Sequence, residues 1–265
     1  MIRFFRTIRQ KLINEGKTTK YIWYAFGEVA LIVVGILIAV QIGKWNEDRA
    51  DAGLQRLYLE RLVANVERDT ERLELTSQLS EFRISLLNFL LKVAEDPEIA
   101  RGRKVEFMVA VRDSYGTASP QMTSDTFQEM ISTGNIRLLD RNLYEALYRY
   151  FQNNERTQNS QTSYDAAQQR YVELRAGVLS VKQVEWLLAQ DSMFTHVDRI
   201  KMETLEYDEA SVVEAAIRLQ QNQDLVDWIP QLLGNSTRNY GELKQQLELA
   251  EALLVDLKAA LEESR

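Results

Sequence analysis

The feature that most constrains this chain is a long apolar run at residues 22–42, near the N-terminus. Its 21 residues contain one charged side chain, that of Glu28. At a rise of about 1.5 Å per residue, a helix of this length spans the roughly 30 Å hydrocarbon core of a bilayer. The run therefore predicts a single transmembrane helix, placed at residues 21–43, and a chain that contacts the lipid bilayer.

The charge on the two sides of this run differs in sign. Residues 1–20 carry six Lys and Arg against Glu15 alone, whereas residues 43–265 carry 26 Lys and Arg against 37 Asp and Glu. Basic flanks of a transmembrane helix stay cytoplasmic, which predicts a cytoplasmic N-terminus and a domain, residues 44–265, on the other side. The acidic domain also argues against nucleic acid as a partner, because phosphate contacts need clustered positive charge.

The first 20 residues are expected to form a cytoplasmic basic amphipathic segment, with Phe4, Phe5 and Ile8 on one helical face. Such a segment lies in the membrane interface; the alternative is a solvated basic stub. The apolar run is longer than the core of a cleaved signal peptide and leaves the membrane through Gln41 to Trp45 without a small-residue cleavage pattern. We therefore expect a retained anchor.

Residue types and motifs give no indication of catalysis. The chain has no Cys, which removes disulfides, thiolate catalysis and zinc–thiolate sites. Its single histidine, His196, has no companion ligand and is interpreted as structural. Gly-rich phosphate loops, nucleophile elbows and zinc-protease motifs are absent from the sequence. We expect no enzyme, no metal and no cofactor.

Apolar periodicity predicts an all-α fold, with the transmembrane helix continuing as one helix to about residue 95 and then into an extracytoplasmic helical bundle. A four-three stripe supports this helix: Leu75, Leu79, Phe82, Leu86, Phe89 and Val93. Further helices are expected at 105–114, 141–178 (capped by Asp140), 181–190, 193–205 and 209–222 (capped by Asp208). A last helix is expected after Pro230 and Gly234, with heptads at Leu243, Leu247, Ala250, Leu254, Leu257 and Leu261.

Residues 120–135 can be interpreted in two ways. Thr126 and Glu129 have the spacing of a capping box, but they can equally lie inside a helix that begins at Pro120. In either case Gly134 suits a left-handed residue after the helix end. A capped short helix accounts for most of the polar residues here.

One face of the transmembrane helix combines a carboxylate with small residues. At 100° per residue Glu28, Gly35, Ala39 and Gly43 fall on one side of the helix. Small residues at four-residue spacing let two helices approach closely, and an ionised carboxylate in a membrane needs a partner. We interpret these four residues as a packing face; the alternative is that Glu28 reaches the interface and the glycines are incidental.

The predicted helix 141–178 carries a polar seam where apolar residues are expected, at Asn154, Thr157 and Gln161. A polar layer in a helical seam either faces water or needs hydrogen-bonding partners. These residues can line a small-ligand pocket between helices, as bundles often do, or they can form a solvated stretch or a contact with neighbouring loops.

Several groups of residues resemble a family of uncharacterised single-span membrane proteins of Gram-negative bacteria. They are the basic start Ile2 to Leu12, Tyr21, Tyr24, Ala25, Gly27 and Glu28, then Gly35 to Ala39 with Gln41, and the exit Trp45, Asn46 and Glu47. A second match lies at Phe127, Glu129, Ser132, Gly134 and Asn135. The resemblance covers the first 47 residues and part of the middle, but not the C-terminal third. It implies an inner-membrane protein with a periplasmic helical domain. It does not indicate any activity.

Together these features predict a non-enzymatic membrane-anchored scaffold or accessory subunit, whose partner is a second copy of the chain or another membrane protein. The alternative is a periplasmic ligand-sensing bundle; with about 20 cytoplasmic residues, it would need a separate output partner. A third interpretation, a hydrolase built from scattered carboxylates, would require one deep polar cleft.

Overall fold

The computed structural model describes residues 18–190 and 205–264. Within these ranges the chain is all-helical, with seven α-helices, two short 3₁₀-helices and no strand. It divides into two compact units, Met1–Leu57 and Tyr58–Arg265, which are described separately. Residues 1–17, most of the expected helix 193–205, and His196 lie outside the described residues.

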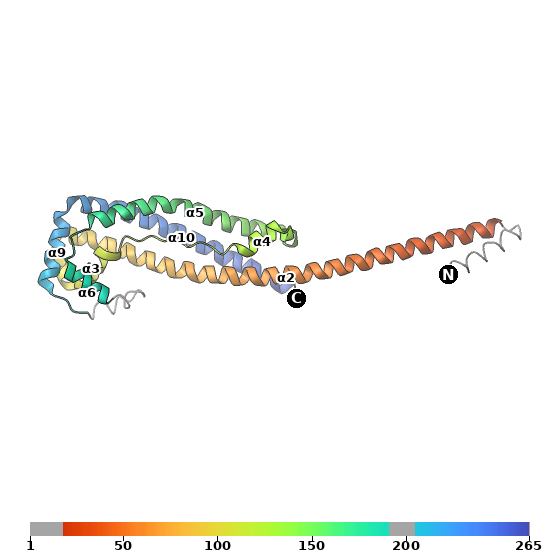
Figure 1. Ribbon diagram of the computed structural model, residues 1–265, viewed down its shortest axis with the longest axis horizontal. Coiled ribbons are helices and arrows are strands. Elements are labelled where there is room, and N and C mark those ends of the chain that lie inside the picture. Colours follow the sequence, from red (N-terminus) through yellow and green to blue (C-terminus); the bar gives the residue numbers. More distant parts are fainter. Residues whose placement is uncertain (1–17, 191–204, 265) are drawn as a thin grey trace. The chain divides into compact units, whose positions relative to one another are not determined.

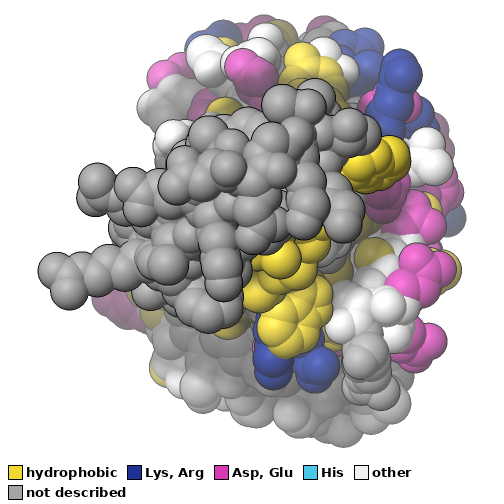
Figure 2. Space-filling view, turned by 90° about the vertical axis from the view of Figure 1, so that its right-hand side faces the viewer, with side chains coloured by type: hydrophobic (Ala, Val, Ile, Leu, Met, Phe, Trp, Pro, Cys, Tyr) yellow, Lys and Arg dark blue, Asp and Glu magenta, His cyan; other side chains and the backbone are white. Residues whose placement is uncertain are grey.

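Helix α2 (Thr18–Glu95) is uninterrupted, which confirms the expected single helix to about residue 95. In the first unit, the large aliphatic side chains between residues 29 and 42 are all about half exposed or more. Among the described residues, α2 is the one helix long and apolar enough to cross a membrane. On the face shown in Figure 2, hydrophobic side chains reach the surface between clusters of charged ones.

The second unit is a bundle of three long helices with caps of shorter ones (Figure 1). The long helices are residues 58–95 of α2, α5 (Arg141–Leu174) and α10 (Gln223–Glu263); α2 and α5 run in one direction and α10 in the other. At one end lie η1 (Pro97–Arg103), α3 (Lys104–Asp113), α6 (Val181–Ala189) and α9 (Glu209–Gln221), and at the other α4 (Asp125–Ser132) and η2 (Asn135–Leu138).

Most helix ends follow from local sequence. The Asp140 carboxylate accepts hydrogen bonds from the backbone of Asn142 and Leu143 at 2.8 and 3.0 Å, and Asp208 caps α9 in the same way. Gly134 takes a left-handed conformation (φ 73°) directly after α4, as expected. Gly177 does the same (φ 82°) beyond α5, so that helix ends at Leu174 rather than at 178.

The expected helix start near Pro120 and the capping box at Thr126 are both wrong. Residues 116–124 have no helical structure, and α4 begins only at Asp125. Thr126 is buried within the helix, where its hydroxyl accepts a 2.9 Å hydrogen bond from Asn65 of α2. We call residues 114–124 the strap; it lies beside the long helices (Figure 1).

The last helix begins earlier than expected. Pro230 and Gly234 lie inside α10 instead of before it. Pro230 removes one backbone donor, but Leu225, Ile229 and Leu232 around it are fully buried, and this packing outweighs the local cost. The predicted stripes are buried only in part: Leu75 is 68% exposed, and Leu253 rather than Leu254 is buried. The other half-buried stripe positions are Leu79, Phe82 and Leu261.

Candidate functional site

The apolar core of the bundle is interrupted on all three long helices. Between Leu73 and Leu86 of α2, the buried residues are Ser77 and Ser80. Between Tyr150 and Tyr164 of α5 they are Asn153 and Thr157, and between Leu232 and Leu243 of α10 they are Ser236 and Asn239. Each helix therefore buries polar side chains where its periodicity calls for apolar ones.

The strap shows that these interruptions lie at one level of the bundle. It runs antiparallel to α2: the backbone N–H of Thr123 donates to Asp69 at 2.8 Å, and Arg72 donates to the carbonyl of Gln121 at 2.9 Å. Farther along, Gly116 lies against the guanidinium of Arg83, where a Cβ would be 2.6 Å from Cζ. Ser119, between these points, is therefore level with Ser77 and Ser80.

Ser119 also connects the strap to the other two helices. Gln158 of α5 donates to its carbonyl at 2.7 Å, and Asn239 of α10 donates to its hydroxyl at 3.2 Å. Polar residues of α5 and α10 thus bind one strap residue that is level with Ser77 and Ser80 of α2. We call this group the polar layer: Ser77, Ser80, Ser119, Thr157, Gln161, Ser236 and Asn239.

Five buried atoms of the polar layer have no hydrogen-bond partner in the part of the chain that the structure describes: Ser77 Oγ, Ser80 Oγ, Gln161 Oε1, Ser236 Oγ and Asn239 Oδ1. A buried polar group without a partner costs about 1–3 kcal/mol. The polar layer is therefore a weak part of the core as well as a polar one.

Two turns from the layer, Asp69 is a fully buried carboxylate. It accepts hydrogen bonds from the backbone and hydroxyl of Thr123, at 2.8 and 2.9 Å, and from the hydroxyl of Tyr150 at 3.1 Å. Arg72 lies 3.9 Å away. Burial and the neighbouring Asp69 carboxylate raise the pKa of Tyr150, so this phenol stays protonated and serves as a donor. Asp69 thus joins α2, α5 and the strap.

A second set of hydrogen bonds joins α5 to α10 at the same level as Asp69. Asn153 donates to Gln246 Oε1 at 2.6 Å, and Gln246 donates to the backbone carbonyl of Tyr150 at 3.2 Å. Arg156 donates through Nη2 to Asn153 Oδ1 at 2.8 Å and to Gln245 Oε1 at 3.0 Å. The buried amide of Asn153 and the exposed amide of Gln245 therefore both hold the side chain of a surface arginine.

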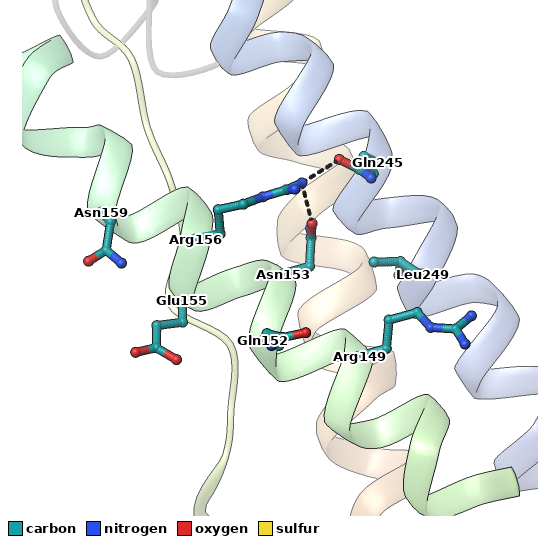
Figure 3. Close-up of a pocket in the computed structure, with 8 residues that line it drawn as sticks. All are labelled: Arg149, Gln152, Asn153, Glu155, Arg156, Asn159, Gln245 and Leu249. Atoms are coloured by element: carbon teal, nitrogen blue, oxygen red, sulfur yellow. Dashed lines mark hydrogen bonds between the residues drawn. The ribbon is translucent and has the colours of Figure 1, made fainter.

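This arginine lines a groove of about 570 Å³ between α5 and α10 (Figure 3). The other lining residues are Arg149, Gln152, Asn153, Glu155, Asn159, Gln245 and Leu249. In Figure 3 Arg149 and Arg156 extend toward α10, whereas Glu155 and Asn159 point to the opposite side of α5. The groove therefore presents two guanidinium groups on its α10 side.

The predicted seam residues of α5 lie beside this groove but do not line it. Thr157 is buried and donates to the carbonyl of Asn153, one turn earlier, at 3.1 Å. Gln161 is half-buried and donates to Asp165 at 2.7 Å, and Asn154 is half-buried. Asn153, not Asn154, turns into the bundle at this level.

The predicted membrane packing face belongs to the first unit. Gly35, Ala39 and Gly43 are exposed, and a Cβ added at either glycine would meet no atom within 4 Å. Glu28 is half-buried. A partner helix could therefore approach these small residues closely.

The polar residues from Thr126 to Asn135 fasten α4 to α2. Glu129 accepts from Arg61 at 2.7 Å and from Tyr58 at 3.1 Å, and Asn135 donates to the Tyr58 hydroxyl at 3.0 Å. The hydrogen bond from Arg61 lowers the pKa of Glu129. These residues thus hold α2 and α4 together.

Sequence reasoning missed Asp69, Gln246 and the strap. Asp69 continues the spacing of Leu62, Val66 and Leu73, so its place in an apolar stripe was a usable signal. Gln246 lies directly before the heptad position Leu247, where a polar residue at the edge of the apolar stripe is ordinary, so its sequence position gave no signal. Nothing in the sequence of the strap marks it as an extended segment bound by side chains.

Comparison with protein-family models, curated proteins and solved structures finds no match for this chain.

Proposed function

We propose that this chain is a non-enzymatic, membrane-anchored scaffold or accessory subunit of a bacterial inner membrane. The observation that carries the proposal is the exposed aliphatic surface of α2. Ten Val, Ile and Leu side chains between residues 29 and 42 are each at least 48% exposed. Such side chains favour insertion into a membrane by about 0.3–0.6 kcal/mol each. Together they favour a membrane over water by several kcal/mol.

The flanking charges support an orientation with the N-terminus cytoplasmic and the bundle periplasmic. Six basic residues lie in the first 20, and the bundle side is acidic. The resemblance of the first 47 residues to single-span proteins of Gram-negative bacteria agrees with this arrangement.

We further propose that the anchor itself contacts a partner, either a second copy or another membrane protein. Glu28, Gly35, Ala39 and Gly43 share one side of the helix. A partner helix on that side would pack closely on the small residues.

Two matched substitutions test this contact, because the chain offers an alanine on each side of the span. Ala39 lies on the proposed face, and Ala30 lies about 170–180° away from it. A photocrosslinker attached at an introduced cysteine one turn beyond the small residues, Asn46→Cys, reports the contact in membranes, because this chain has no other thiol. We expect Ala39→Ile to abolish the crosslink and Ala30→Ile to preserve it. A chain that gives no crosslink and is monomeric in detergent refutes the proposal.

A second candidate function is ligand sensing by the bundle, and the unpartnered atoms of the polar layer favour it. A ligand that satisfied them would stabilise the bundle. Thermal-shift screening of the full-length protein with metabolites tests this. Substituting Thr157 and Gln161 of the layer by alanine should then remove the shift, and a shift that persists argues against the layer as the site.

A further inference from the structure

The groove between α5 and α10 is lined by two arginines, Arg149 and Arg156, that have no carboxylate partner among the described residues. Several exposed arginines pair with a glutamate: Arg61, Arg101, Arg141 and Arg170 each have a carboxylate oxygen within 3.4 Å. Arg149 and Arg156 make no ion pair with any described residue. In a protein with a formal net charge of −7, these two unneutralised guanidinium groups face one groove.

Arg156 is also held in place before any ligand binds. Its Nη2 donates to two neutral amide oxygens, of Asn153 and Gln245. Asn153 is 8% exposed and is itself fixed by Gln246. Neutral acceptors orient a guanidinium without cancelling its charge, and its Nε–H and Nη1–H groups remain available. Such preorganisation lowers the entropic cost of binding.

We propose that this groove binds a small anionic ligand bearing carboxylate or phosphate groups. Arg156 is the anchor, since its planar fork matches both groups. Arg149 lies seven residues earlier on the same helix, about 10 Å along the axis, and contacts a second acidic or polar group of the ligand. The groove volume of about 570 Å³ lies in the range of small-molecule sites. Gln152 and Gln245 supply neutral donors and acceptors.

The test is a calorimetric titration of the full-length protein in a neutral detergent at fixed ionic strength, since salt screens exposed charges. The probes are inorganic phosphate, succinate and uncharged succinamide. We expect saturable binding of phosphate, succinate or both, and none of succinamide; the preferred anion identifies the acidic group. Absence of saturable binding by both anions, or equal binding of succinamide, overturns the proposal.

Variants locate the site. Arg156→Gln should raise the Kd at least tenfold, and Arg149→Gln at least threefold. Arg170→Gln, which removes the same charge from the same helix, is the matched control and should leave the Kd unchanged within twofold. Equal weakening by all three variants would indicate nonspecific attraction and overturn the proposal. Arg156→Lys keeps the charge without the fork, so it should bind more weakly than the wild type even where it unfolds at the same temperature. Membrane crosslinking has no bearing on these results, so this proposal and the scaffold proposal fail separately.

Discussion

Replacing Asp69 gives the most informative test of how the bundle is held together. Its carboxylate is fully buried and accepts from three donors: the Thr123 backbone, the Thr123 hydroxyl and the Tyr150 hydroxyl. Asp69→Leu replaces the carboxylate by a larger branched apolar side chain and leaves the Thr123 N–H and the Tyr150 hydroxyl without an acceptor. At about 1–3 kcal/mol for each lost partner, we expect a loss of about 4 kcal/mol in the free energy of unfolding.

Asp69→Asn is the matched control, because an amide can keep these contacts. Its oxygen can take the place of Oδ2, which accepts from Tyr150 and from the Thr123 backbone. Its NH₂ group then faces the Thr123 hydroxyl, which can accept instead of donating. The charge-assisted part of the hydrogen bonds is lost, so we expect a cost of about 1 kcal/mol.

Thermal unfolding of the full-length protein in neutral detergent, followed by circular dichroism, separates the two variants. For a unit of about 200 residues, 1 kcal/mol corresponds to about 2–4 °C. Asp69→Leu should therefore lower Tm by about 8–16 °C and Asp69→Asn by a few degrees. Equal Tm values for Asp69→Leu and the wild type would refute the assigned role. Equal losses in the two variants would show that charge, not hydrogen bonding, matters.

Two further predictions concern the polar layer and the α2–α4 contact. Ser236→Ala removes a buried hydroxyl that has no partner among the described residues, so it should leave the free energy of unfolding unchanged or raise it by up to about 1 kcal/mol. Ser180→Ala, the control, removes a helix cap and should lower the free energy of unfolding by about 1 kcal/mol. A loss in both variants would contradict the assignment. Glu129→Gln should lower Tm at pH 7. Because Arg61 lowers the folded-state pKa of Glu129, its stabilisation is complete above the unfolded-state pKa and is lost as pH falls through the folded-state value. The Tm difference should therefore close on acidification, and a gap independent of pH would contradict the assigned ion pair.

Much of the fold could be predicted from sequence because it depends on local patterns. The helix that ends at Glu95, the Asp140 and Asp208 caps and the turn at Gly134 all rest on residues near each other in the chain. The start of α10 could not be predicted in this way, because Pro230 and Gly234 usually end a helix, and packing against distant residues overrides that preference here. The strap is likewise held by side chains 39 to 120 residues away.

The polar seam was predictable in kind but not in position. Periodicity placed Asn154 in the seam, whereas Asn153 is the residue buried against Gln246. An α-helix turns 100° per residue, so over several turns a one-residue offset is within the error of any spacing rule. The partners on α2 and α10 were not predictable, because no pattern within α5 states which levels of the other helices meet it.

The polar residues also account for the alignment of the three long helices. An apolar heptad alone does not fix axial position, since a shift by seven residues restores the same pattern. Such a shift of α10 would replace Gln246 by Leu253 at the Tyr150 carbonyl and leave Asn153 without its acceptor. A shift of α5 against α2 would separate Tyr150 from Asp69. Each displaced register buries polar groups without partners, at about 1–3 kcal/mol each, whereas the apolar positions hardly discriminate. Asp69, Asn153 and Gln246 therefore select one register from several that the apolar residues allow.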